Sequence, residues 1–453
     1  MWFRRDLRLA DNPALFEACS SHDEVLPLFV HDDRLRAPAG AARLRFLGGC
    51  LAALDEALDG FLVCRAGDPV SVLPRLAREV GATAVYCAED FGPYGVRRDD
   101  TVERALADQG VELGRVGSSY AVPPGTVFTR SSGPFKVFTP FSKAWRVHGW
   151  DDPVDRPARP SWVTGIGSEG VAEAPTGGPP ALPEPGERAA LERAEAFLDE
   201  LVEEYADRRN EPAADATSHL SPYLKFGCVH PRQLLARLGR GRGPQTFANE
   251  LCWREFYADV LFHQPETART SLVEKMKAMP VDEGAEADAR FEAWSTGRTG
   301  YPIVDAGMRQ LLATGWMHNR VRMISASFLV KDLHMSWQRG AKWFLEHLVD
   351  ADLASNNHGW QWVAGCGTDA APYFRVFNPV SQGRRFDPSG DYVRRWLPEL
   401  GGIPGPDVHE PWSRHARDLF SAPEQVDAGS QYPGPIVDHA AERAESLRRF
   451  GSL

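Results

Sequence analysis

The chain has 453 residues, more than one hydrophobic core usually fills, so two domains are expected. Hydrophobic residues make up 43% and charged residues 25%, as in ordinary globular proteins, and no window holds the roughly 18 uninterrupted apolar residues that a membrane helix needs. The net charge of −11 argues on average against a polyanionic partner, but a binding face needs only local basic density, which the C-terminal half provides.

The seven cysteines are odd in number, scattered, and never paired as C-x-x-C. That pattern suits a reducing cytoplasm and argues against a disulfide framework or a zinc site. No H-x-x-x-H pair accompanies them, so we predict no metal. The N-terminus alternates charged and apolar residues and lacks the apolar stretch of a secretory signal.

The first 125 residues alternate short apolar runs with helical stretches, which predicts a doubly wound α/β domain with a parallel sheet. The expected strands are 25–30, 61–65, 83–87 and 111–116, and the expected helices are 41–58, 70–80 and 97–109. No G-x-G-x-x-G follows a strand, so the commonest dinucleotide-binding motif is missing. The first strand looks truncated, which a start codon chosen a few residues late would explain.

Residues 126–187 are expected to form a long interdomain linker, because from about residue 152 they are rich in Pro and Gly and lack periodicity. From residue 188 to 453 the sequence becomes helical, which predicts an all-α C-terminal domain. Nine of the thirteen tryptophans lie between Trp253 and Trp412, and most of them are expected to fill a helical core.

Two segments of the helical half combine charges with aromatic or apolar residues. In residues 249–257, Glu250, Trp253 and Arg254 share one helix face. That face suits a planar ligand beside a phosphate, but equally a salt bridge over a buried tryptophan. In residues 315–323, Arg320 and Arg322 point apart, so we expect them to contact different partners.

A third segment spans residues 350–362, where Asp352, Asn356 and Trp360 lie on one helical face. Acids and amides in an apolar stretch are costly to bury without partners. A polar ligand, or arginines from the preceding segment, would satisfy them.

Taken together, the three segments closely resemble the photolyase/cryptochrome family, and within it the class I bacterial branch that acts on cyclobutane pyrimidine dimers. The similarity extends from Trp2 to about Trp412 and is densest in Gly300–Arg309 and in the second and third segments. It implies an α/β antenna domain at 1–125, a linker at 126–187, and a helical domain at 188–453 that holds FAD and binds DNA.

The resemblance also implies roles for individual residues. Those expected to bind FAD are Tyr205, Thr217, Ser218, Leu220, Ser221, Asn319, Arg322, Asp350, Asp352 and Asn356, with Arg322 paired with Asp350 and Asn356 facing flavin N5. Those expected to act in catalysis are Glu250, Trp253, Met323, Asn356 and Trp362. The expected DNA contacts are Trp253, Arg320, Trp362 and Arg375, and the expected electron carriers are Trp360 and Trp337.

The activity that the resemblance implies is a light-driven carbon–carbon lyase reaction that repairs DNA. Reduced, anionic FAD absorbs light and passes one electron to a cyclobutane pyrimidine dimer flipped out of the duplex, the ring opens, and the electron returns. A dimer is already poorly stacked and paired, which lowers the cost of extruding it.

Two alternatives within the family are a cryptochrome-type blue-light photoreceptor and a (6-4) photolyase. Plant-type cryptochromes have an acid at the position of Asn356, and (6-4) photolyases have histidines at the positions of Asn319 and Met323. The residues present here favour repair of the cyclobutane dimer. Outside the family, the alternative is a helical flavoprotein or electron carrier that only binds FAD.

Two positions depart from the family pattern. Family members usually pass electrons along three tryptophans, and the third position falls on Gly284. His358 stands where many relatives have Gly, and we expect it to be a packing substitution.

A second, antenna chromophore is also expected, and the sequence favours a deazaflavin over a folate. A folate site would place an Asn-Glu pair near Gly95, whereas Pro93-Tyr94-Gly95 followed by Asp99 resembles deazaflavin-binding relatives, with Asp99 as the candidate contact. The expected partner is DNA that contains pyrimidine dimers. No membrane and no obligate protein partner are expected, so we predict a cytoplasmic monomer.

Overall fold

The computed structural model describes residues 1–157, 161–172, 176–369, 374–413 and 432–453. Its strand pairings are all parallel. A three-stranded sheet has the order β1 (Trp2–Phe3), β3 (Leu28–His31), β4 (Val63–Ala66); β5 (Ala84–Glu89) pairs with β6 (Glu112–Ser118), and β2 (Glu24–Val25) pairs with β7 (Ser161–Trp162). The predicted strand 25–30 is divided between β2 and β3 around Pro27, which has no amide hydrogen to donate to a sheet.

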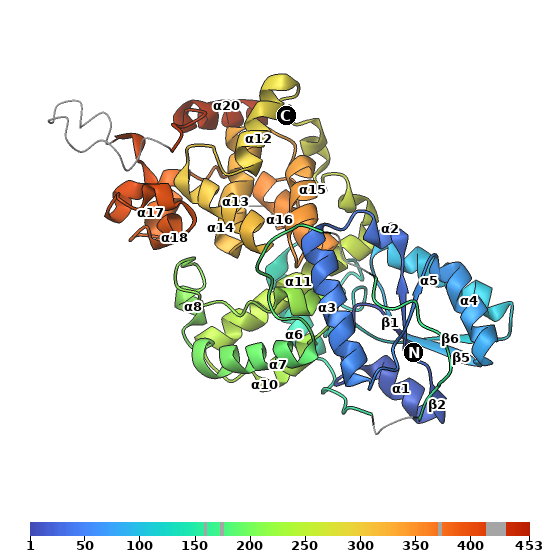
Figure 1. Cartoon of the computed structure of the whole chain (residues 1–453). Helices are drawn as coiled ribbons and strands as arrows, with labels where there is room; N and C mark the ends of the chain where they lie inside the picture. The colour runs from blue at the N-terminus through green and yellow to red at the C-terminus, as the bar shows by residue number, and fades with distance from the viewer. Residues whose placement is uncertain (158–160, 173–175, 370–373, 414–431) are drawn as a thin grey trace.

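Helices alternate with these strands, namely α1 (Pro13–Ser21), α2 (Asp33–Arg36), α3 (Ala41–Ala57), α4 (Pro69–Val80) and α5 (Pro93–Ala107). Asn12 and Asp68 cap α1 and α4 with their side-chain oxygens, each followed directly by a proline, which suits the first helical position. Figure 1 shows α3 on the side towards the helical part of the chain, and α4 and α5 on the opposite side of β1. The predicted doubly wound α/β unit is confirmed.

The expected linker contains a helix that the sequence did not indicate, α6 (Phe138–His148), as well as β7. One face of α6 packs on α11 (Arg242–His263): the rings of Phe141 and Phe256 lie 5.0 Å apart, and Trp145 Nε1 donates to Glu255 Oε2 at 2.6 Å. Residues 126–187 therefore include packed elements as well as extended chain.

The rest of the described chain is helical, as predicted, and has no strand after β7. Figure 1 shows α11 between α7 and α10 below it and an upper group of helices, which includes α12 to α18 and α20, with α8 to one side. The bounds are α7 (Glu187–Ala196), α8 (Tyr205–Arg208), α9 (Ser221–Phe226), α10 (Pro231–Arg237), α12 (Ala285–Ser295), α13 (Pro302–Thr314), α14 (Asn319–Ser327), α15 (Trp337–His347), α16 (Leu353–Ala364), α17 (Pro379–Phe386), α18 (Asp391–Trp396) and α20 (His439–Gly451). Short π-helical and 3₁₀ turns connect several of them.

Hydrophobic packing is continuous across the expected domain boundary. One buried cluster joins side chains of the strands and of α3 to side chains of α7–α11. A second cluster consists of buried hydrophobic residues of the upper helices and the segments that join them, the first of them Met276 and the last Tyr432. Gly227 makes the junction close, because it has φ +70° and a Cβ there would lie 1.9 Å from the Arg5 carbonyl oxygen. The N-terminal turn is thus docked directly on the helical part.

A second close approach fixes the helix that carries the third segment. A Cβ on Gly340 of α15 would lie 2.1 Å from Cη2 of Trp360 on α16. Only glycine lets the Trp360 ring lie against α15, so this contact sets the depth at which α16 packs.

None of the helices in the described ranges is long and apolar enough to cross a bilayer. The same residues contain no group of three or more His, Cys, Asp and Glu side chains arranged to hold a metal ion.

Candidate functional site

A cavity of about 520 Å³ opens where α8, α9, α11, α14 and α16 meet. Residues from all three sequence segments and from 205–221 line it together: Tyr205, Thr217, Ser218, Leu220, Ser221, Glu250, Trp253, Asn319, Arg320, Arg322, Met323, Asp350, Asp352, Asn356, Trp360 and Trp362. These are all the residues predicted for flavin binding, catalysis, DNA contact and electron transfer except Trp337 and Arg375.

Trp337 and Arg375 lie outside the cavity lining. Trp337 is buried at the start of α15, and its Nε1 donates to Ser271 Oγ at 3.1 Å. Arg375 is exposed, with its guanidinium 4.8 Å from the Phe377 ring.

A carboxylate on the cavity wall holds two of the expected flavin contacts. Asp350 accepts from Arg322 Nη2 at 2.8 Å, from Arg322 Nη1 at 3.2 Å, and from Ser221 Oγ at 2.6 Å. The predicted Arg322–Asp350 pair is therefore present. Its charges partly neutralise each other, so the cavity wall carries fixed hydrogen-bonding groups without a lone buried charge.

Asn356 has a defined hydrogen-bonding state. Its Nδ2 donates to the Ala341 carbonyl at 3.0 Å and to Asn357 Oδ1 at 2.9 Å. Both amide hydrogens are then used, and the Oδ1 oxygen remains as an acceptor at the cavity wall. A ligand facing it would best present an N–H donor.

Two other polar atoms of the lining are buried and have no hydrogen-bond partner among the described residues, Thr217 Oγ1 and Trp360 Nε1. Unpaired buried polar atoms are rare in folded proteins and are costly. Their position on a cavity wall indicates a polar ligand.

Asp352 joins the cavity to the N-terminal unit. Its carboxylate caps α16 by accepting from the Ser355 amide, and it accepts from Arg5 Nη2 at 2.7 Å, with Lys225 Nζ at 3.9 Å. Burial acts to raise the pKa of Asp352, but the positive charges of Arg5, Lys225 and Arg254 hold it well below its ordinary value. Burial, with Arg5 nearby, lowers the pKa of Lys225 to about 7.

Glu250 is paired across the cavity with Arg209, which follows α8, and not with its helix neighbour Arg254. Burial raises the pKa of Glu250, and the charge and hydrogen bond of Arg209 act against that rise. Arg254 instead donates to the Ser119 and Leu224 carbonyls and lies 4.6 Å from the Tyr120 ring. The shared helix face predicted for this segment thus separates into two sets of contacts.

Aromatic and thioether side chains form the apolar part of the lining. Trp253, Met323 and Trp362 all lie on it half-buried, from α11, α14 and α16 respectively. Tyr257, one turn after Trp253, adds a ring 5.3 Å from the indole. Flat, partly exposed rings on opposite elements suit a planar ligand of the size of a base.

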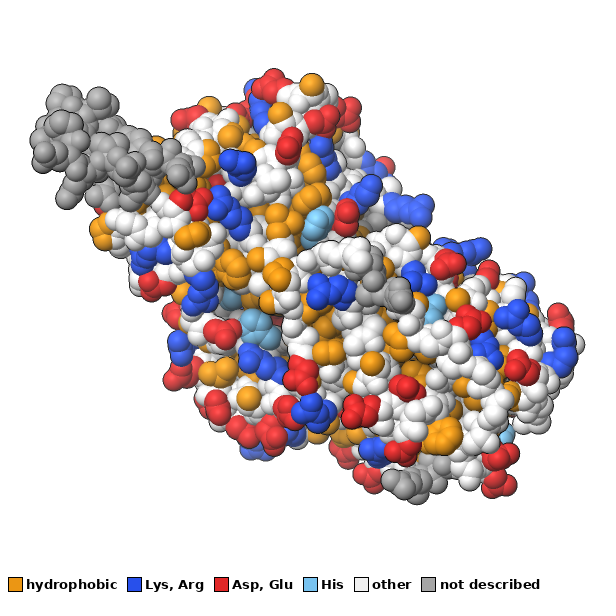
Figure 2. Space-filling model, in the orientation of Figure 1, with side chains coloured by type: hydrophobic (Ala, Val, Ile, Leu, Met, Phe, Trp, Pro, Cys, Tyr) orange, Lys and Arg blue, Asp and Glu red, His pale blue; other side chains and the backbone are white. Residues whose placement is uncertain are grey.

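Arg320 brings a positive charge to the cavity lining. Arg320 donates from Nε and Nη2 to Asn210 Oδ1 at 3.1 and 2.8 Å, and its guanidinium lies 4.5 Å from the Phe386 ring. Burial, together with the charges of Arg209, Arg375 and Arg385, lowers its pKa to about 10, so it stays charged at neutral pH. On the face drawn in Figure 2, Lys and Arg side chains are interspersed with Asp and Glu despite the net negative charge.

A second cavity of about 270 Å³ lies between the N-terminal unit and the start of α16. Tyr94 lines it and donates from Oη to Asp32 Oδ2 at 2.5 Å. Arg43 and Lys225 add positive charge, and Arg43 Nε is buried without a partner among the described residues.

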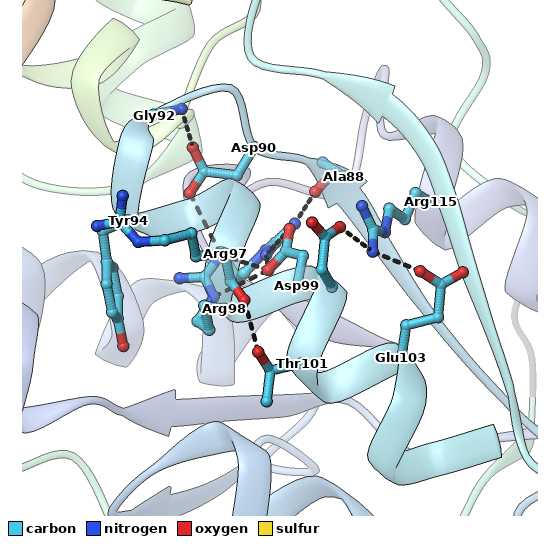
Figure 3. Close-up of polar contacts among 12 residues, drawn as sticks. Ala88, Asp90, Gly92, Tyr94, Arg97, Arg98, Asp99, Thr101, Glu103 and Arg115 are labelled. Atoms are coloured by element: carbon cyan, nitrogen blue, oxygen red, sulfur yellow. Dashed lines mark hydrogen bonds and ion pairs between the residues drawn. The ribbon is translucent and has the colours of Figure 1, made fainter. Parts of the chain in front are cut away.

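Asp99, the predicted antenna contact, does not line this second cavity. It is buried and accepts from Arg4 Nη1 at 2.6 and 2.8 Å and from Arg98 Nε at 2.9 Å. Figure 3 shows it within this network on α5, and Tyr94 on the same helix. Asp99 thus contacts the second cavity only through Arg4 and Arg98, the two lining residues that donate to its carboxylate.

The sequence did not single out several residues that the structure brings to the two cavities, notably Arg5, Arg209, Lys225 and Tyr257. Tyr257 follows Trp253 by four residues and could have been found by helix spacing. The other three meet their partners only through tertiary contacts, which no local pattern encodes.

Fold and cavity together define a class of protein: an α/β unit joined to a helical unit, with a cavity lined by aromatic rings, hydroxyls and paired charges that suits a large, polar, planar ligand. Comparison with known proteins agrees. Residues 1–160 match the family model described as DNA photolyase, and residues 247–452 match the FAD binding domain of DNA photolyase.

Individual relatives cover nearly the whole chain. The deoxyribodipyrimidine photo-lyase of Streptomyces griseus is 41% identical over 99% of this chain and 98% of its own, and that of Escherichia coli is 38% identical with the same coverage. Among solved structures, a class III photolyase from Agrobacterium tumefaciens covers 100% of this chain and 96% of its own with a TM-score of 0.90 at 36% identity. A Synechocystis cryptochrome covers 99% and 98% with a TM-score of 0.89 at 30% identity. The chain belongs to the photolyase/cryptochrome family.

Proposed function

We propose that the protein is a light-dependent DNA-repair enzyme, a deoxyribodipyrimidine photo-lyase of the class I type, with FAD in the large cavity. The observation that carries the proposal is the convergence on one cavity lining of sixteen residues predicted for flavin binding, catalysis, DNA contact or electron transfer. The fold alone favours no single activity, because the structural relatives include both a photolyase and a cryptochrome. The choice between them rests on the site residues.

The cavity residues fit FAD. The hydroxyls of Thr217, Ser218 and Ser221 suit its phosphates and ribityl chain, and the unpaired Thr217 Oγ1 gains a partner there. Arg322 and Asp350 would hold the edge of the ring system with hydrogen bonds of both polarities. Bound FAD in its reduced, anionic form supplies the light-driven electron.

Asn356 favours repair over signalling. Its free Oδ1 can accept a hydrogen bond from a ring N–H, as reduced flavin has at N5, and an amide cannot deliver a proton there. Asn319 and Met323, likewise, offer none of the acid–base chemistry of histidine.

The substrate residues act by binding and orientation. Trp253 and Trp362 would stack against the two rings of an extruded dimer, with Met323 packing beside them. Glu250, whose pKa is raised by burial, would hydrogen-bond the pyrimidine edge. Arg320 and Arg375 would contact flanking phosphates, which positions the strand without reading its sequence.

We further propose that the second cavity binds a planar, anionic antenna chromophore, a deazaflavin and not a folate. Arg43, Lys225 and the phenol of Tyr94 suit an anionic, hydrogen-bonding ligand, and the choice of a deazaflavin rests on the sequence Pro93-Tyr94-Gly95 followed by Asp99. An archaeal photolyase from Sulfolobus tokodaii, 30% identical with a TM-score of 0.84, is described with two FAD molecules, which are said to imply a novel light-harvesting cofactor, so FAD itself is the alternative for this cavity. Absorption spectra after incubation with deazaflavin, folate or excess FAD will identify the chromophore.

We also propose that the protein is a cytoplasmic monomer that acts on DNA containing pyrimidine dimers. Its proposed domains are an antenna domain at 1–125 and a catalytic helical domain at 188–453, joined by a linker at 126–187.

Binding tests the proposal directly. Flavin-loaded protein should bind an oligonucleotide with one cyclobutane dimer much more tightly than the intact strand, and Trp253→Ala should remove most of that preference, since base–aromatic stacking is worth about 1–3 kcal/mol per base. Equal, weak binding of both strands by the wild type would instead indicate a flavoprotein or electron carrier without repair function.

A further inference from the structure

The ring of Phe138 lies flat on the indole of Trp253. Their centroids are 3.7 Å apart and their planes differ by 6°. Phe138 is the first residue of α6 and is not part of the cavity lining, whereas Trp253 is. Phe138 therefore covers the indole face turned away from the cavity and leaves the other side of Trp253 for a ligand.

The backbone around Phe138 is bonded to the chain that follows α16. The Lys136 carbonyl accepts from Thr368 Oγ1 at 2.5 Å and from the Asp369 amide at 3.2 Å, and the Phe138 amide donates to Asp369 Oδ1 at 3.3 Å. Because α16 carries Trp362 and ends at Ala364, residues 136–138 stack on one expected dimer wall and are hydrogen-bonded to the chain that directly follows the helix of the other.

A ring stacked on one face restricts how an indole can turn. Rotation of Trp253 about χ1 or χ2 would break its contact with Phe138 and move it against Phe256, 5.7 Å away and fully buried. A side chain already held in its binding orientation loses less freedom when a ligand stacks on it, and that saving appears as affinity.

We propose that Phe138 is a positioning residue for substrate binding: it holds Trp253 as a preformed platform for the extruded dimer, and the 136–138 backbone fixes the spacing between Trp253 and Trp362. The proposal rests on the proposed function. It places a determinant of damage recognition in a segment that the sequence assigned to the linker.

The test compares dissociation constants of flavin-loaded protein for a dimer-containing and an intact oligonucleotide. Phe138→Leu should reduce the preference for the dimer by about three- to tenfold, the worth of an aromatic pair beyond its buried area. Phe138→Tyr, which keeps the ring, should retain the preference. The matched control is Phe135→Leu, which removes a ring of the same segment that contacts Phe141.

A double substitution shows whether Phe138 acts through Trp253. If it does, adding Phe138→Leu to Trp253→Ala causes no further loss of preference, whereas independent roles give additive losses and contradict the proposal. If Phe138→Leu fails to fold or to hold flavin, Thr368→Val decides, because it removes only the hydroxyl that donates to Lys136. It should lower the preference about twofold or more, and an unchanged preference would contradict the proposal.

The outcomes separate this inference from the proposed function. A wild type without preference for the dimer refutes the proposed function. If the wild type prefers the dimer and Phe138→Leu shows the same preference, only the role of Phe138 is refuted.

Discussion

The indole rings of Trp294 and Trp360 lie 6.2 Å apart at an interplanar angle of 70°. Trp360 lines the large cavity, and Trp294 is fully buried with its Nε1 donating to the Ser325 carbonyl at 3.0 Å. Gly284, the position at which the resemblance implies the family's third tryptophan, directly precedes α12, and a Cβ there would meet no atom within 4 Å.

We predict slow photoreduction of oxidised flavin in the purified protein. An electron hole on Trp360 can reach Trp294, but Trp294 is buried, and the half-buried Trp343 lies beyond Phe291, whose ring is 5.5 Å from Trp294 and 5.8 Å from Trp343. A hole held on buried rings recombines before an external donor supplies an electron. The measurement is flavin bleaching under blue light with a thiol donor.

Two substitutions serve as controls for that experiment, Trp294→Phe and Trp343→Phe. Rapid wild-type reduction that either one abolishes would show a rerouted exit and contradict the expectation. Repair by chemically reduced protein should be normal in all three proteins.

Arg320→Ala should weaken binding to damaged and intact strands alike. Loss of one phosphate contact lowers the slope of log affinity against log salt by about 0.7–0.9, depending on whether the contacted DNA is single- or double-stranded. The matched control is Arg188→Ala, because Arg188 on α7 is exposed and pairs only with Glu184 and Glu192 among the described residues. An unchanged slope for Arg320→Ala would mean that Asn210 and Phe386 account for all contacts of Arg320.

Asp350→Asn should reduce flavin retention. The substitution keeps the shape of the side chain but leaves Arg322 without its counter-charge. Removing one partner of a fully buried ion pair destabilises a protein by about 3–5 kcal/mol. Because Arg322 is 24% exposed, we expect the cavity wall that holds the flavin to be destabilised by about 2–3 kcal/mol. Flavin-to-protein absorbance ratios after purification will report it. Asp207→Asn, at an exposed pair with Arg242, should leave the ratio unchanged, and equal ratios in both variants would refute the role of Asp350.

His358 should make the protein sensitive to acid. It is fully buried, stacks with Tyr257 at 5.7 Å, and burial lowers its pKa from 6.5 to about 4. As the pH falls, the unfolded state binds a proton at His358 before the folded state does. The free energy of unfolding is therefore unaffected by the titration of His358 above pH 6.5 and decreases by up to roughly 3 kcal/mol as the pH falls towards 4.

His230 and His318, also buried with lowered pKa values, add to the same loss. The free energy of unfolding in urea should therefore decline less steeply between pH 7 and 4 for His358→Gln than for the wild type. Superimposable pH profiles would show that His358 does not titrate in this range.

The sequence was most informative where function depends on local pattern. The helix that carries Asp352, Asn356 and Trp360 was predicted from their spacing, and the cap by Asp352 fixes its start. The pairing of Arg322 with Asp350 was predicted from the resemblance, and the structure confirms it.

Prediction failed where a contact depends on tertiary packing. α6 was missed because its apolar face is short and lies among Pro- and Gly-rich chain, although Phe141 and Trp145 bury it firmly on α11. The sequence also did not indicate that Arg4 and Arg98 hydrogen-bond the Asp99 carboxylate, whose role at the antenna chromophore stays a prediction. Arg4 is 95 residues from Asp99 in the sequence, and Glu255 is 110 residues from Trp145, and partners so far apart leave no periodic signal.

The most direct test of the proposed function is a measurement of DNA repair. Flavin-loaded, chemically reduced protein is mixed with an oligonucleotide containing one cyclobutane thymine dimer, and intact thymines are quantified by chromatography after blue light or darkness, with a (6-4) photoproduct as the parallel substrate. We expect conversion of the cyclobutane dimer in the light only, and none of the (6-4) product. Absence of light-dependent conversion of the cyclobutane dimer, with flavin and DNA both bound, would contradict the proposed function.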